Sequence, residues 1–175
     1  INQSVVYNTK RELRNTAYTG TWLTDAKIHF SKPTCAAYNM GKDYVNGSPI
    51  RQQYLETALK WIADRDKLNT IEDYMALHQN DENANQIWIY FKRVIEWIET
   101  IFPNKRKEMK GIDWGFLYND YKDAELDPTA LEAEIKSLMA DDDVTNKKGI
   151  YTYVLTRDLR FLSIRAFTDT QKRIA

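Results

Sequence analysis

The stretch at residues 83–102, NANQIWIYFKRVIEWIETIF, constrains the fold more than any other part of the chain. Its apolar side chains recur at the three- and four-residue steps of a helix face, at Ile87, Phe91, Val94, Ile98 and Ile101. Trp97 widens this face, so the helix needs neighbours on more than one side. Asn83 and Gln86 have capping-box spacing, and Pro103 ends the helix because proline lacks an N–H. The sequence predicts a mainly α fold, an irregular multi-helix bundle around this helix with little or no β structure.

The composition excludes several classes of protein. With 43% hydrophobic residues the 175-residue chain can bury a core, and its longest apolar run, residues 87–91, is far too short to cross a membrane. No basic segment followed by an apolar one opens the sequence, and the single Cys35 cannot form an internal disulfide. We therefore expect a cytoplasmic setting and no membrane partner.

Local signals divide the rest of the chain into shorter elements. We expect helices at residues 9–19, 21–32, 48–63, 70–79, 113–121 and 127–140, the first two forming a hairpin. Residues 35–47 read as a loop because of their glycines and scattered aromatic residues, and a basic loop follows Pro103. The pattern at residues 150–167 is equally compatible with strand and with helix.

Charge is unevenly distributed, although the chain as a whole is neutral. Residues 1–112 carry 16 basic and 13 acidic side chains, residues 113–145 carry 2 and 10, and residues 146–175 carry 7 and 2. The acidic block could pair with the basic segments on either side, or it could separate a surface that faces nucleic acid from one that faces protein. The simplest interpretation, which we favour, is that these charges lie on solvated helix faces. We expect a helical domain at residues 1–145 and a basic C-terminal connector at residues 146–175. A capping box at residues 168–171 opens a helix with barely one turn left, so we expect a fragment of a longer protein.

No catalytic or metal site is predicted. His29, His78 and Cys35 are far apart in sequence and lack metal-ligand spacing. Asp25 lies four residues before His29, but no nucleophile accompanies them, so a surface ion pair is favoured. The acidic residues 141–143 lack the spacing of a calcium loop and are expected in a solvated turn.

The basic loop is the candidate binding site. It carries four cations, Lys105, Arg106, Lys107 and Lys110, which have the composition of a surface that contacts DNA phosphates. For an isolated loop of four cations, a solvated surface without a ligand is the favoured interpretation before any family resemblance is considered. Arg11 and Arg14 form a second candidate DNA surface, for which structural salt bridges are an equal alternative.

Five segments together resemble one bacterial family. They read ELRNTAYTGTWLTDAKIHFSK, NGSPIRQQYLETALKWI, RKEMKGIDWGFLYNDYKD, DDDVTNKKGIYTYVLT and LSIRAFTDTQKR. The family joins an N-terminal ParB-like domain to a C-terminal HNH endonuclease, and its relatives include GmrSD-like modification-dependent restriction enzymes. The resemblance covers nearly the whole chain and corresponds to the region between the two functional halves.

The resemblance also implies which functional parts lie elsewhere. In the family, the front domain is associated with nucleotide binding through an Asp-Gly-Gln-Gln-Arg motif and a later Phe-x-x-x-Asn. This chain lacks the first motif, and Asn2 matches the Asn of the second as a nucleotide-binding remnant, with Glu12 and Leu13 matching the Glu-Leu that follows. The Cys-x-x-Cys and His-Asn-His nuclease core would follow the Arg-Ala-Phe-Thr at residues 165–168 and is absent from this sequence.

The resemblance thus implies a non-catalytic helical linker or regulatory domain of an HNH-type, modification-dependent restriction endonuclease that acts in phage defence. We expect no cofactor in this fragment, whereas the parent protein would use a divalent metal and a nucleotide. Expected partners are DNA, the missing ParB-like and HNH domains, and a second copy of the chain. The alternative is a protein-interaction or dimerisation module that does not bind nucleic acid.

Overall fold

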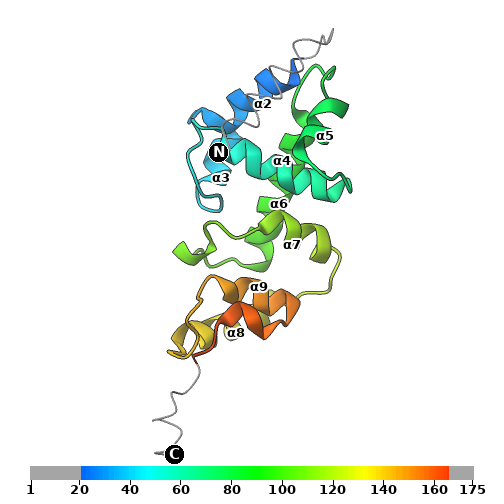
Figure 1. Cartoon of the computed structure of the whole chain (residues 1–175). Helices are drawn as coiled ribbons and strands as arrows, with labels where there is room; N and C mark the ends of the chain where they lie inside the picture. Colours follow the sequence, from blue (N-terminus) through cyan, green and yellow to red (C-terminus); the bar gives the residue numbers. More distant parts are fainter. Residues whose placement is uncertain (1–20, 166–175) are drawn as a thin grey trace, which may run out of the picture.

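The structure is a computed structural model and describes residues 21–165 of the chain (Figure 1). Within these residues the elements are α2 (Trp22–Ser31), α3 (Ala36–Gly41), α4 (Gln53–Arg65), α5 (Ile71–Leu77), α6 (Asn85–Ile101), the 3-10 turn η1 (Lys107–Met109), α7 (Trp114–Tyr121), α8 (Pro128–Ala140), α9 (Gly149–Thr156) and the 3-10 turn η2 (Leu159–Leu162). The prediction of a mainly α fold is confirmed. The predicted helix at residues 9–19 and the capping box at residues 168–171 lie outside the described residues.

The helix α6 lies at the centre of the described part, as its sequence predicts. It contacts α2, α3, α4, α7 and α8, which gather around it from both ends of the molecule (Figure 1). Its buried side chains are Ile87, Tyr90, Phe91, Val94, Ile95, Ile98 and Ile101. The predicted cap differs by one position: Ala84 is the N-cap, and its N–H donates to Asp25 Oδ2 at 2.8 Å. The start of α6 is therefore fixed by a carboxylate of α2.

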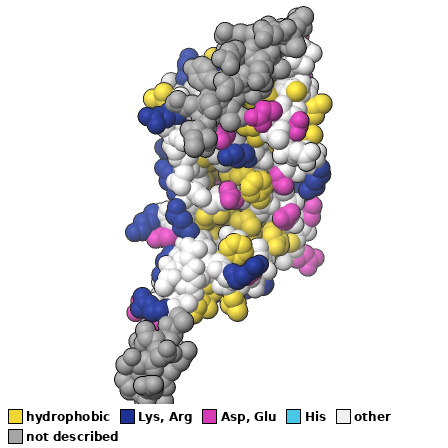
Figure 2. Space-filling model, in the orientation of Figure 1, with side chains coloured by type: hydrophobic (Ala, Val, Ile, Leu, Met, Phe, Trp, Pro, Cys, Tyr) yellow, Lys and Arg dark blue, Asp and Glu magenta, His cyan; other side chains and the backbone are white. Residues whose placement is uncertain are grey.

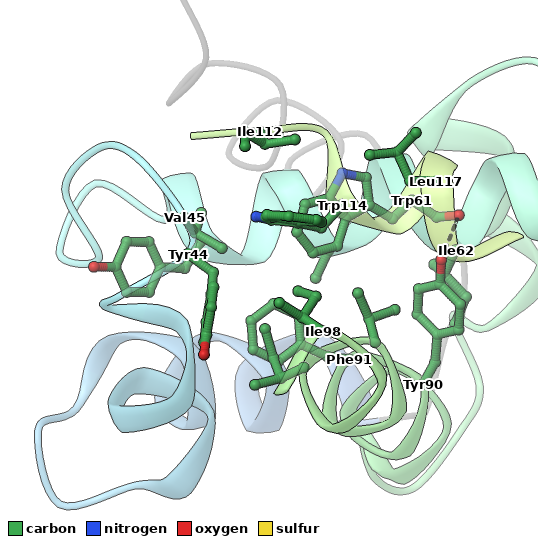
Figure 3. Close-up of a cluster of buried hydrophobic side chains, with 14 of the residues drawn as sticks. Tyr44, Val45, Trp61, Ile62, Tyr90, Phe91, Ile98, Ile112, Trp114 and Leu117 are labelled. Carbon is green, nitrogen blue, oxygen red and sulfur yellow. Dashed lines mark hydrogen bonds between the residues drawn. The ribbon is translucent and has the colours of Figure 1, made fainter. Parts of the chain in front are cut away.

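Aromatic packing joins α4, α6 and α7 (Figure 3). The rings of Trp61 and Phe91 are stacked, with centroids 6.0 Å apart and an interplanar angle of 14°. The Tyr90 hydroxyl donates to the Trp61 carbonyl oxygen at 3.1 Å. Gly115 lets α7 approach this cluster, because a Cβ atom there would lie 2.0 Å from Trp61 Cγ. The core thus depends on a helix-to-helix contact that only glycine permits.

Two expectations about the first half of the chain are wrong. Residues 36–41, expected within a loop, form α3, whose Ala37 and Gly41 are buried against the neighbouring helices. The helix expected from residue 48 begins only at Gln53, because Gln52 adopts a left-handed conformation with φ 62°. Residues 48–51 form a separate turn, which leaves Ile50 81% exposed instead of on the predicted buried face.

The ambiguous region at residues 150–167 is mostly helical in the part that the structure describes, with the end of α9 followed by the 3-10 turn η2, whereas Ile164 is extended. The helix α9 buries Ile150, Tyr151, Val154 and Leu155, and it packs against both α7 and α8. The only extended pairing among residues 21–165 is one antiparallel bridge between Val144 and Ile164. The division at residue 145 into a domain and a connector stays a prediction.

No helix within residues 21–165 is both long enough and apolar enough to cross a membrane.

Candidate nucleic-acid interface

The basic loop projects from the end of α6 and is anchored to the core behind it. Pro103 follows the last turn of α6, and the short turn η1 places Met109 fully inside the protein. The Met109 carbonyl oxygen accepts a hydrogen bond from Trp114 Nε1 at 2.8 Å. The Gly111 N–H donates to the Tyr44 carbonyl oxygen at 2.8 Å, which ties the loop to the segment after α3. The loop therefore has a defined position and not only a basic composition.

The loop and the end of α3 together line a groove of about 370 Å³, here called the basic groove. Its lining residues are Lys42, Asp43, Tyr44, Lys105, Arg106, Lys107, Met109 and Lys110. The four predicted loop cations are thus brought together, and Lys42 joins them from a distant part of the sequence. Figure 2 shows Lys and Arg side chains along the edge of the molecule where this loop projects in Figure 1.

Lys105 is held by acidic and aromatic neighbours. Its Nζ lies 3.0 Å from Glu99 Oε1 and 3.5 Å from Asp43 Oδ2, and 5.5 Å from the centre of the Tyr44 ring. The hydrogen bond to Glu99 raises the pKa of Lys105 above its ordinary value. Burial, with the Glu99 charge as a second cause, raises the pKa of Tyr44 to about 12. Lys105 therefore links the loop to α6 and to the segment after α3.

Arg106 is held by residues of two helices, α8 and α9. Its guanidinium forms a two-pronged pair with the Glu132 carboxylate of α8, with Nη1 at 3.0 Å from Oε2 and Nη2 bound to Oε1. Nη1 also lies 3.5 Å from the Tyr151 hydroxyl of α9. The two charged side chains are only 22% and 12% exposed, and the hydrogen bond from Arg106 lowers the pKa of Glu132. Arg106 thus braces the basic loop against α8 and α9.

The remaining cations of the basic groove have few or no acidic partners. Lys107 is 92% exposed, and its nearest carboxylate, that of Glu108, is 4.0 Å away. Lys42 is exposed and Lys110 is half-buried, and neither makes an ion pair with another residue in the described range. Sequence reasoning missed Lys42, because nothing close to it in the chain marks it as a partner of the loop.

The other predicted site residues fall into two groups. Asn2, Arg11 and Arg14 lie outside the described residues. Asp25 Oδ1 lies 3.3 Å from His29 Nε2, and because its other oxygen holds the start of α6, this pair is structural. This agrees with the interpretation favoured from the sequence.

The acidic turn after α8 has a structural explanation. Asp141 Oδ1 accepts the Asp143 N–H at 2.9 Å, and Lys147 Nζ donates to the Leu138 and Asp141 carbonyl oxygens at the helix end. A cation there complements the negative end of the helix dipole. Within residues 21–165 no three His, Cys, Asp or Glu side chains are grouped so that they could hold a metal ion.

A second groove, here called the apolar groove, lies between α7 and the segment formed by α9 and η2 and measures about 470 Å³. Its lining includes Ile112, Phe116, Leu117, Thr152 and Phe161, with Asp113 and Lys148 as charged members. Phe116 and Phe161 are 36% and 39% exposed. Figure 2 also shows hydrophobic side chains gathered around the middle of the molecule.

Comparisons of the chain with protein-family models, with curated proteins and with solved structures find no match. The interpretation of the two grooves therefore depends on their own geometry and charge.

Proposed function

We propose that this chain is a non-catalytic helical linker or regulatory domain of an HNH-type, modification-dependent DNA restriction endonuclease, and that it contacts the DNA backbone through the basic groove. The proposal combines the family resemblance of the five sequence segments with the chemistry of this surface. The parent protein would supply the divalent metal and the nucleotide through its other domains. The role of this chain is to hold the nuclease relative to the ParB-like domain and to the DNA.

The lysines of the basic groove that are not held by ion pairs within the fold are the observation that carries the proposal. Lys42, Lys107 and Lys110 present ammonium groups on one surface, whereas Lys105 and Arg106 hold that surface in place. Lysines that contact phosphates contribute affinity without reading base identity, and they release counterions from DNA. A domain that positions a nuclease without choosing the sequence needs this kind of contact.

A salt series with duplex DNA tests the proposal. We expect the 175-residue chain to bind mixed-sequence duplexes more weakly as the salt concentration rises, and the double variant Lys107→Glu/Lys110→Glu to lose most of this binding on every sequence alike. Lys32→Glu/Lys67→Glu is the matched control, because both lysines are exposed and lie outside the basic groove. Binding that does not depend on salt, or equal loss in both variants, would contradict the proposal.

The apolar groove favours a second candidate function, a protein-interaction module. Phe116 and Phe161 expose aromatic surface across a groove of ligand-binding size, and exposed apolar surface of this kind marks interaction sites. We expect Phe116→Ser to abolish self-association, or binding of the parent's other domains added in trans, measured by light scattering. A strict monomer that the added domains leave unchanged would count against this candidate.

A further inference from the structure

We infer that Lys42, Lys107 and Lys110 form a phosphate-binding site, in which Lys42 supplies a contact that the basic loop alone lacks. The inference deepens the proposed function and rests on it, since it assigns Lys42 a separate phosphate contact on the same surface. Its ligand is a phosphate group, from the phosphodiester backbone of DNA or from a free polyphosphate.

The backbone sets the position of Lys42 relative to the loop. Lys42 follows the last residue of α3, and the Tyr44 and Val45 N–H groups both donate to the Gly41 carbonyl oxygen, which closes a tight turn there. The hydrogen bond from Gly111 to Tyr44 then joins this turn to the end of the basic loop. The two segments therefore meet without a ligand, so binding a phosphate does not require them to be brought together first.

The distribution of charge decides which cations can reach a ligand. Both prongs of the Arg106 fork are occupied by Glu132, and Lys105 is occupied by Glu99. Asp43, the one carboxylate that lines the basic groove, lies 3.5 Å from Lys105 and is partly neutralised by it. Lys107 is only weakly paired, with Glu108 4.0 Å away, and Lys42 and Lys110 have no ion pair in the described range, so the positive charge available to a ligand lies on these three lysines.

The chemistry of these three side chains indicates phosphate as the ligand. An ammonium group is a compact charge with three donors on a flexible stem, and it binds phosphate oxygens without the planar geometry that arginine uses to recognise guanine. A single carboxylate offers one charge to the three ammonium groups, whereas a DNA backbone or a polyphosphate offers a closely spaced series of charges that can pair with all three. The site should therefore bind along a backbone and ignore the bases.

The number of contacts sets the expected salt dependence. Three neutralised phosphates correspond to a slope of log K against log salt of about −2.7, and loss of one contact reduces its magnitude by about 0.9. If Lys105 and Arg106 also touched the backbone, the slope would approach about −4.5. The slope thus counts the lysines that bind.

The experiment measures anisotropy of a labelled duplex of about 20 base pairs with the full chain, between about 50 and 300 mM KCl. We expect Lys42→Gln to reduce the slope by about 0.9, Lys42→Arg to restore it, and Lys32→Gln to leave it unchanged. Thermal unfolding should be the same for all four proteins, since the substituted side chains are on the surface. A Lys42→Gln protein with the slope of the wild type would overturn the inference and leave the proposed function standing.

A second arm separates the two sources of phosphate. Should the wild type show no salt-dependent binding to the duplex, the proposed function fails, and calorimetry with tripolyphosphate then decides the inference. Heat of binding that disappears in Lys42→Gln assigns the site to free polyphosphate. Absence of tripolyphosphate binding by the wild type, together with absence of duplex binding, overturns the inference as well.

Discussion

Replacing Arg106 by Gln separates a structural cation from a ligand-binding one. The substitution keeps a polar but shorter side chain and removes the positive charge and the two-pronged pair with Glu132. Glu132 is 12% exposed and would retain only Lys136, whose Nζ is 3.8 Å away, as a charged neighbour. A carboxylate left partly buried in this way destabilises the folded state.

The size of the effect follows from the two lost hydrogen bonds. Hydrogen bonds to charged groups contribute about 1.5 to 3 kcal/mol each, and Gln can replace part of one of them. We therefore expect the free energy of unfolding to fall by about 2 to 5 kcal/mol, measured by urea unfolding at pH 7. Arg106→Lys, which keeps the charge and loses the fork, should recover only part of this loss.

The pH dependence gives an independent check on the same pair. Because Arg106 lowers the pKa of Glu132 in the folded protein, the pair stabilises the fold fully above about pH 4.3, the ordinary value for Glu. This contribution disappears as the pH falls through the lower folded pKa. The difference between wild type and Arg106→Gln should therefore be constant near neutral pH and shrink in acid.

DNA binding supplies the result that would refute this reasoning. If Arg106 only holds the loop in place, Arg106→Gln and the wild type should have the same slope of log K for DNA binding against log salt, measured at a temperature where both proteins are folded. Suppose instead that Arg106→Gln is as stable as the wild type and that the magnitude of its slope is smaller by about 0.9. Arg106 would then contact a phosphate, and its assignment as a structural cation would be wrong.

Three further perturbations test individual contacts of the fold. Gly115→Ala should lower the free energy of unfolding by about 3 kcal/mol in thermal or urea unfolding, because its Cβ atom would lie 2.0 Å from Trp61 Cγ and force the ring to move; an unchanged midpoint would contradict the close contact. Thr70→Ala should cost about 1 kcal/mol through loss of the capping box with Asp73, and Thr70→Ser should cost much less. Tyr44 should ionise near pH 12 in an ultraviolet titration compared with Tyr44→Phe, and because its folded pKa is raised, its contribution to stability falls between about pH 10 and pH 12.

The elements with strong local signals could be predicted from the sequence. The apolar face of residues 83–102 is wide enough to force a central position, and Asp127 followed by Pro128 does open α8, with Asp127 Oδ1 accepting the Thr129 N–H at 2.9 Å. In these cases the side chains that define the helix are neighbours along the chain. Local periodicity and capping were therefore sufficient.

The two wrong predictions show where tertiary contacts override local signals. At Gly41 a Cβ atom would lie 3.2 Å from both Phe91 Cζ and Tyr54 Cδ2, so α3 exists because it fits closely against α4 and α6. No periodicity within residues 35–47 records that fit. Ser48 and Pro49 do open a turn, with the Arg51 N–H donating to the Ser48 carbonyl oxygen, but the left-handed Gln52 separates this turn from α4.

The candidate site was predictable in position but not in the roles of its residues. In sequence Lys105, Arg106 and Lys107 are equivalent consecutive cations, and the partners that distinguish them, Glu99 and Glu132, lie on different helices. The acidic block at residues 113–145 contributes to this division, because Glu132 and Glu134 of α8 pair with Arg106 and Arg157 on either side of the block in sequence. A charge count along the chain therefore includes cations, such as Arg106, that are already paired within the fold. It also leaves out Lys42, which the fold brings into the basic groove although it is distant from the loop in sequence. The number of free cations changes little, but their identity changes, and that identity determines which substitutions weaken binding and which weaken the fold.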